Sequence, residues 1–352
     1  MDKITGMSRP AAMLGAMLLA ATLAHPAAAQ QQLTVVGQGG ALQDAERKAF
    51  FEPFASATGT KIIEDSYTGE LAKVRAMVKS GNVTWDVLQL DNNALLMGCD
   101  EGILEKIRYP QVVNSSDFLE VGTHECGVGA FAWSKVIAFD SKRTPQGPKT
   151  WADFWDVTKF PGKRGLRSTA RLTLEIALLA DGVKPLEMYK VLSTPAGLDR
   201  AFRKMDELKP HIVWWRTGAE PIERLVAGDI AYTSGFNGRV EAANASGQNL
   251  KMEWDGQVLG IDYWGIVKGS PRKAVAEQFI TFASRPEVAS KLPEFIRYGV
   301  LNKGAIGLVR AEIRDDLPTS PKNLANALRT DAAFWAERGE EIEARFKVWQ
   351  AK

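Results

Sequence analysis

The alternation of strand-like and helix-like segments constrains this chain more than any other feature. Short apolar runs at 33–36, 61–63 and 86–90 are typical of buried strands, whereas 41–58 and 70–79 repeat apolar residues at helical spacing. Strands that alternate with helices form parallel sheets whose faces are both covered. The sequence therefore predicts an α/β protein with mostly parallel sheets flanked by helices.

Two longer β-like runs interrupt this alternation. The run 128–139 is long for a strand within one lobe, and 258–267 is a second candidate of the same kind. Such segments can leave one lobe and enter another, so we predict a two-lobed chain with a central sheet in each lobe and a hinge cleft between them. Ligands bind such sheets beyond the carboxyl ends of the strands. The predicted first lobe comprises 30–131 and 264–302, and the second comprises 132–263 and 303–352.

The first residues have the pattern of an export signal. Two basic residues precede the apolar run 11–24, and the alanines at 27–29 are the small residues that a signal peptidase recognises. A membrane anchor is the alternative, but the run is short for a bilayer and Pro26 follows it closely. We predict a signal peptide over residues 1–29 and a protein that is free in the periplasm.

Charge and motif content exclude several classes of protein. The chain has 44 basic and 42 acidic residues and no basic run, which argues against nucleic-acid binding. Beyond the signal segment, His124 and His211 have no metal-ligand spacing, and no nucleophile elbow occurs. The turn around Gly39 resembles a dinucleotide fingerprint, but Leu42 replaces its third glycine. We therefore predict a protein that is not an enzyme and holds no cofactor or metal.

The two cysteines, Cys99 and Cys126, both follow the signal segment. In an oxidising compartment, an intramolecular disulfide between them is the simplest prediction. It would tie the segment after Asp91 to the run that starts near Gly127. A pair of buried thiols is the alternative, because spacing alone does not fix the geometry.

Two charged residues near strands are the main candidates for ligand contact. Arg239 lies with Asn237 in a predicted loop that follows the strand 230–233, where a guanidinium can hold a carboxylate in a bidentate grip. An exposed surface position is the alternative for this arginine. Asp262 lies in an otherwise apolar strand, where a carboxylate needs a partner such as a ligand ammonium, a lysine or backbone groups.

Two further strand ends carry polar candidates. Asp91 follows the strand 86–90 and is either a cleft residue or the N-cap of the next helix. Gln38 and Gly39 form a turn between a strand and a helix, where backbone N–H groups suit the oxygen atoms of a ligand.

Aromatic residues near the predicted crossings and strand ends are candidates for the cleft walls, although an aromatic side chain is more often part of a core. Trp214 and Trp215 point to opposite faces of their strand, and we favour Trp215 because it is nearer the strand end. The other aromatic candidates that we select are Tyr263 and Tyr298.

Several short motifs, in a fixed order, resemble one known family. Beyond the signal segment, the chain is similar over nearly its whole length to the periplasmic spermidine/putrescine-binding proteins of ABC importers. It is most similar to a subgroup with amino-acid-like ligands such as 4-aminobutyrate. The motifs begin at Asp91, His124, Phe160, Leu174, Gly218, Phe236 and Tyr298.

This resemblance implies a type II periplasmic-binding fold, in which two lobes close on a ligand and the closed form docks on a membrane permease. It also implies that Asp262 takes a ligand ammonium and that Asn237 and Tyr298 line the pocket. A monomer is the default expectation.

The sequence departs from the polyamine pattern at Arg239, because a guanidinium repels a ligand that carries only positive charge. We therefore expect a zwitterion, with its carboxylate on Arg239 and its ammonium on Asp262. A polyamine remains an alternative, and so does a small dicarboxylate if Arg167 and Arg171, near another strand end, also face the cleft. A periplasmic sensor is the alternative outside transport.

Overall fold

A computed structural model of the protein describes residues 1, 2, 6 and 31–352. The apolar run and the cleavage position of the predicted signal peptide lie outside the described residues. Residues 31–352 form one compact unit. Within the described part of the chain, no helix has both the length and the apolar character that crossing a membrane requires.

The strands of the described residues form one mixed sheet, which confirms the predicted α/β class. Its order is β2-β1-β3-β9-β5-β8-β6-β7, with β4 paired to β5 and β10 to β9. Strand β1 is parallel to β2 and β3, and β6 is parallel to β7 and β8. The strands are β1 (Gln32–Gly37), β2 (Lys61–Ser66), β3 (Val87–Asp91), β4 (Thr123–His124), β5 (Gly127–Asp140), β6 (Arg164–Arg167), β7 (Ile212–Trp215), β8 (Tyr232–Phe236), β9 (Leu250–Ile266) and β10 (Leu328–Arg329).

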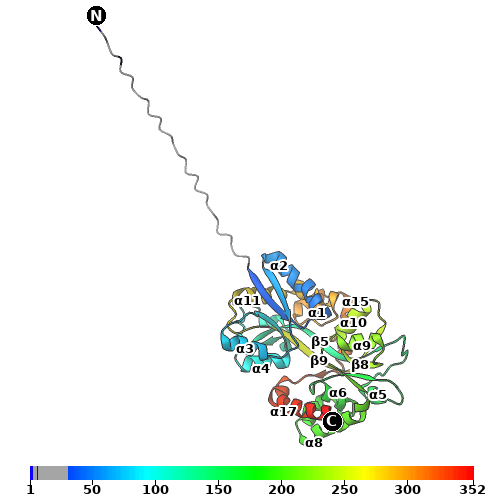
Figure 1. Ribbon diagram of the computed structural model, residues 1–352. Coiled ribbons are helices and arrows are strands. Elements are labelled where there is room, and N and C mark those ends of the chain that lie inside the picture. The colour runs from blue at the N-terminus through cyan, green and yellow to red at the C-terminus, as the bar shows by residue number, and fades with distance from the viewer. Residues whose placement is uncertain (3–5, 7–30) are drawn as a thin grey trace. The chain divides into compact units, whose positions relative to one another are not determined.

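The long strands β5 and β9 join the parallel groups β2-β1-β3 and β8-β6-β7 into this one sheet. They run antiparallel along each other, with register shifts between Gly129 and Phe131 and between Lys135 and Ile137. One end of β9 pairs with β3, and one end of β5 pairs with β8. Figure 1 shows both strands between the upper and lower groups of helices. The two crossing segments are therefore strands shared by both halves, whereas the lobe boundaries stay a prediction.

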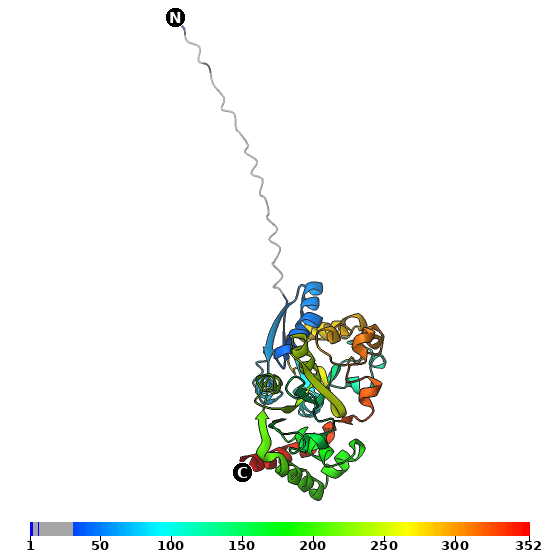
Figure 2. The same ribbon diagram turned by 90° about the vertical axis from the view of Figure 1, so that its right-hand side faces the viewer.

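Helices cover the sheet at both ends. Figures 1 and 2 show α1, α2 and α11 at one end and α5, α6, α8 and α17 at the other. The longer helices are α1 (Gly40–Glu46), α2 (Glu52–Thr58), α3 (Ala72–Ser80), α4 (Asn92–Asp100), α6 (Thr173–Ala180), α8 (Pro195–Leu208), α9 (Glu220–Ala227), α10 (Asn237–Ala245), α11 (Lys273–Ala283) and α17 (Ala332–Ala351). The shorter ones are α5 (Trp151–Trp155), α7 (Met188–Leu192), α12 (Pro286–Ala289), α13 (Leu292–Phe295), α14 (Lys303–Leu308), α15 (Ala311–Arg314) and α16 (Pro321–Leu324).

Two local features differ from the sequence-based prediction. The segment 41–58 is not one regular helix, because a π-helical turn at Arg47–Phe51 separates α1 from α2. The predicted loop after β8 is instead the start of α10, so Asn237 and Arg239 lie in its first turn. The second difference places Arg239 on a helix that begins at the strand ends, where the cavity lies.

Candidate ligand-binding site

A cavity of about 940 Å³ lies at the strand ends and is lined by residues from both halves of the sheet. Its charged lining is acidic at Glu70, Asp91, Asp262 and Glu343, and basic at Lys73, Arg75, Arg167, Arg171, Arg216 and Arg239. Its aromatic lining consists of Tyr67, Trp85, Trp133, Phe236 and Tyr298. The volume falls within the range of small-molecule sites. Of the predicted site residues, Gln38, Gly39, Asp91, Arg167, Arg239, Asp262 and Tyr298 line it.

Asp262 is the most deeply placed acidic residue of the lining, with 2% of its surface exposed. It accepts a hydrogen bond from Trp133 Nε1 at 2.5 Å and another from Gln89 Nε2. Burial, followed by the charge of Asp91, raises its pKa to about 7. Among the described residues it has no ion-pair partner, so a cation in the cavity would supply the missing charge.

A second carboxyl group, that of Glu46, lies behind the cavity wall. It is fully buried, and neither oxygen has a hydrogen-bond partner in the described structure. Burial and then the charge of Asp262 raise the pKa of Glu46 well above its usual value. The neutral form of Glu46 is therefore favoured, and Asp262 is the group of these two that ionises more readily.

Arg239 approaches the cavity from the first turn of α10 and is 7% exposed. Its Nη2 lies 3.2 Å from the carbonyl oxygen of Gly39 and 3.5 Å from that of Gln38. A Cβ at Gly218 would lie 2.5 Å from Arg239 Nε and one at Gly40 would lie 2.8 Å from Nη1, so a side chain at either position would displace the guanidinium. Its only described acceptors are these neutral carbonyls, so the guanidinium can still take an anion.

Asp91 has a different environment from Asp262. It forms an ion pair with Arg171 Nη2, and its Oδ1 accepts from Ala94 N at 2.9 Å, which makes it the N-cap of α4. Burial alone would raise the pKa of Asp91, but the charge of Arg171 and the Ala94 N–H outweigh it and lower that pKa. Asp91 therefore combines the two roles that the sequence left open, since it lines the cavity and also caps a helix.

Aromatic rings form the remaining walls. Tyr298 stacks on Phe131 with ring centroids 5.2 Å apart, and Trp133 meets Phe236 edge-on at 5.3 Å. Tyr67 donates to the carbonyl of Gln89 at 2.6 Å. Trp133 is a lining residue that is absent from the candidates selected from the sequence. Its position opposite Gly260 on β9 depends on strand register, which the sequence does not give.

Three predicted site residues do not line the cavity. Asn237 is fully buried, and its amide binds the backbone, accepting from Ser134 N at 2.9 Å and donating to the carbonyl of Arg297 at 2.5 Å. Trp215 is fully buried and packs against Phe236. Tyr263 donates its hydroxyl proton to the carbonyl of Val121 at 2.6 Å.

The predicted role of the turn after β1 also needs correction. The N–H of Gly39 donates to Gln43 Oε1 at 3.1 Å, so it is not free for a ligand. Instead, the carbonyl groups of Gln38 and Gly39 face Arg239. This turn therefore holds the guanidinium rather than a ligand anion.

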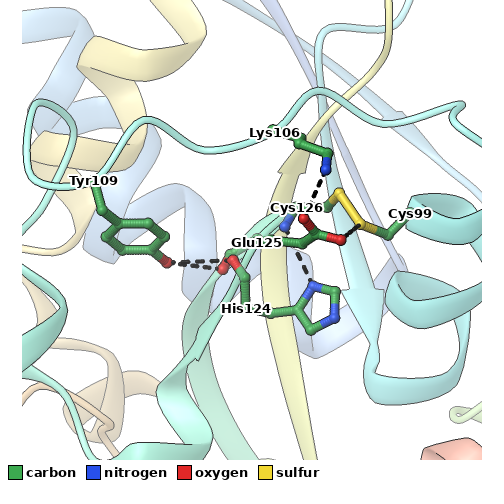
Figure 3. The surroundings of a disulfide bond; sticks show 7 residues. Cys99, Lys106, Tyr109, His124, Glu125 and Cys126 are labelled. Atoms are coloured by element: carbon green, nitrogen blue, oxygen red, sulfur yellow. Dashed lines mark hydrogen bonds and ion pairs between the residues drawn. A yellow bond between two sulfur atoms is a disulfide. The ribbon is translucent and has the colours of Figure 1, made fainter.

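The predicted disulfide between Cys99 and Cys126 is present, with Cα atoms 5.7 Å apart (Figure 3). It joins the end of α4 to the start of β5. His124 lies beside it and accepts from Cys126 N at 3.2 Å. The ligand atoms of these three residues lie within 4.8 Å of one another. Both sulfur atoms are in the disulfide, however, so the group offers no thiolate to a metal.

Comparison with known proteins identifies the family. A model of the bacterial extracellular solute-binding protein family matches residues 49–316. The chain belongs to this family. A gamma-aminobutyric acid-binding protein of Pseudomonas aeruginosa is 46% identical over 333 residues, which cover 94% of this chain and 95% of that protein. The spermidine/putrescine-binding periplasmic protein of Escherichia coli is 21% identical over 280 residues, with coverage of 77% and 78%.

A solved structure supports the same assignment. The GABA receptor Atu4243 has a TM-score of 0.81 and 31% identity, with 92% of this chain and 98% of that chain covered. The family and fold that the sequence predicted are thus confirmed, and the polyamine-binding relatives are the more distant ones. Membership of this family supports a ligand-binding role outside the cytoplasm.

Proposed function

We propose that this protein captures 4-aminobutyrate, or a zwitterion of similar size, in the periplasm and delivers it to the membrane permease of an ABC importer. One observation carries the proposal. A single cavity contains a buried carboxylate without a cationic partner, Asp262, and a buried guanidinium bonded only to neutral carbonyls, Arg239. A ligand with one ammonium and one carboxylate satisfies both groups. The similarity to a gamma-aminobutyric acid-binding protein favours the same ligand class.

A polyamine fits this cavity less well. Arg167, Arg171, Arg216 and Arg239 all line it, and only Arg171 has an acidic partner among the described side chains. A like charge in a partly dehydrated site costs on the order of several kcal/mol. The distant polyamine-binding relatives therefore support the fold more than the ligand.

Delivery would follow from closure of the two proposed lobes around the ligand. The contacts that bridge the proposed lobes at the cavity include Arg239 with the turn at Gln38 and Gly39, and Arg171 with Asp91. Asp262 and Arg239 both belong to the proposed second lobe, whereas Gln38 and Asp91 of the first lobe line the same cavity. A ligand held by the second lobe would therefore also contact the first, bind the closed state better and shift the population toward it. The export signal, the lobe boundaries, the monomeric state and docking on a permease are parts of this proposal.

A thermal-shift screen of protein stripped of ligand by unfolding and refolding tests the function. The probes are 4-aminobutyrate, putrescine, spermidine and malate, because a ligand of the native state raises its melting temperature. We expect the largest increase with 4-aminobutyrate. An increase with putrescine or malate that exceeds it would contradict the proposed ligand.

A further inference from the structure

The carboxyl ends of three neighbouring parallel strands each carry an arginine that lines the cavity. Arg239 follows β8, Arg167 is the last residue of β6, and Arg216 follows β7. The strands are adjacent in the order β8-β6-β7, and neighbouring strands are about 4.8 Å apart. The three guanidinium groups therefore originate from one row along the edge of the sheet.

These arginines differ in their partners. Arg239 donates to two carbonyl groups. Arg167 neither donates a side-chain hydrogen bond nor forms an ion pair in the part of the chain that the structure describes, and its Nε is buried without an acceptor. Arg216 is exposed, and among the described contacts only its backbone N–H is bonded, to Glu220. The guanidinium groups of Arg167 and Arg216 therefore offer hydrogen-bond donors that have no acceptor among the described residues.

The charges of the cavity show what remains after a simple zwitterion binds. Asp91 and Arg171 neutralise each other, and the proposed ligand neutralises Asp262 and Arg239. Arg167 is then left mostly buried without an anion within ion-pair distance, although Glu70 and Glu343 act on it from farther away. Burial, followed by the charge of Arg171, lowers the pKa of Arg167, as expected for a cation that lacks an acceptor. A buried charge without a partner is costly.

The size of the cavity also indicates a ligand larger than a simple zwitterion. Its volume of about 940 Å³ is near the upper end for sites that bind drug-sized molecules, which have many more atoms than a four-carbon amino acid. The cavity therefore has both room for a ligand larger than 4-aminobutyrate and a positive charge, on Arg167, without an anionic partner.

We propose that Arg167, with Arg216 beside it, forms a second anion subsite that binds a further carboxylate of a longer ligand. The matching chemical class is an amino diacid with a secondary ammonium between two carboxylate-bearing arms. The ammonium lies at Asp262, one carboxylate at Arg239 and the other at Arg167. The inference rests on the proposed function for the first two contacts.

Isothermal titration calorimetry with matched ligands tests this subsite. The first probe is 4-aminobutyrate that carries a carboxyethyl group on its nitrogen, and the second carries a propyl group of similar length without the charge. The wild-type protein should bind the carboxyethyl compound at least about tenfold more tightly than the propyl compound. In R167Q this preference should fall to about threefold or less. R203Q is the control, because Arg203 is exposed on α8 and does not line the cavity, and it should keep the full preference.

The outcomes separate this proposal from the proposed function. If the wild-type protein binds 4-aminobutyrate but does not prefer the carboxyethyl compound, or if R167Q keeps the preference, the second subsite is wrong and the proposed function stands. If the preference is present and depends on Arg167 while 4-aminobutyrate itself does not bind, the subsite stands and the proposed ligand is wrong.

Discussion

Asp91 and Asp262 are register partners on neighbouring antiparallel strands and line the same cavity, yet their environments are opposite. Asp91 has an arginine and a helix N-terminus as partners, and its pKa is lowered. Asp262 receives only neutral donors, from Gln89 and Trp133, and its pKa is raised to about 7. The protein has thus supplied a cation to one aspartate and left the other without one.

This difference teaches which carboxylate belongs to the structure and which to the ligand. A partly buried ion pair that also caps a helix holds two parts of the chain together, whereas a buried carboxylate without a cation is poised to bind one.

Asp262→Asn should have the largest effect on binding. The change keeps the shape of the side chain but removes the charge that faces the ligand ammonium. Affinity for 4-aminobutyrate should fall about a thousandfold, or about 4 kcal/mol, in a calorimetric titration. Asp255→Asn, at an exposed position on the same strand β9, is the matched control and should change affinity less than about twofold. Equal losses in the two variants would contradict the assignment.

Removal of the disulfide should affect stability rather than binding. Cys99 ends the helix that Asp91 caps, and the two cysteines are 27 residues apart. A disulfide that closes a loop of this length stabilises the folded state by about 3.5 kcal/mol. The double variant C99S/C126S should therefore lower the free energy of unfolding by about that amount in urea titrations. An affinity loss comparable to that of Asp262→Asn would show instead that α4 positions the ligand directly.

Asp91→Asn should lower stability by about 3 kcal/mol, because it leaves Arg171 without its anion in a largely buried place. Because asparagine is also a good N-cap, the loss of stability in this variant should come mainly from the broken ion pair. Urea unfolding of Asp91→Asn, Arg171→Gln and the double variant measures the coupling. The double variant should lose less than the sum of the two single variants, and strict additivity would contradict the pair.

Affinity should depend on pH through Asp262. The ligand ammonium binds the ionised carboxylate of Asp262. In the free protein this carboxyl group has a pKa of about 7. Below pH 7 protonation competes with binding, so affinity should fall by up to about tenfold per pH unit and should level off above pH 8. Asp91 and Arg171, whose charges act on this group, stay ionised over this range, and the neutral form of the neighbouring Glu46 is favoured. Titrations of wild type between pH 5.5 and 8.5 should show this slope, and Asp262→Asn should lack it.

The sequence predicted the class of fold, and most of its candidate site residues line the cavity, because both depend on local patterns. Alternating apolar runs marked the strands, and an acidic residue in an apolar strand marked Asp262. Arg239 lines the cavity but lies in another element than predicted, because Asn237 and Gly238 suggest a loop whereas the chain starts α10 there.

The errors concern features that only tertiary packing decides. Trp215 was preferred as a cleft wall, yet it lies buried behind Phe236, and Trp133 takes the position beside Asp262. Which face of a strand meets the cavity depends on register with β9, and that register pairs residues more than a hundred positions apart. The partner of Asp91, Arg171, is 80 positions away in the sequence.

The central claim is that the cavity recognises one positive and one negative charge on the same small ligand. Calorimetric titration of ligand-free wild-type protein at pH 7.5 with 4-aminobutyrate, butyrate, butylamine and putrescine tests it most directly, because these ligands differ in which charges they carry. We predict that 4-aminobutyrate binds most tightly and that loss of either charge weakens binding at least about a hundredfold. If putrescine binds as tightly as 4-aminobutyrate, the pairing of Arg239 with a carboxylate is contradicted. If butyrate binds as tightly, the pairing of Asp262 with an ammonium is contradicted.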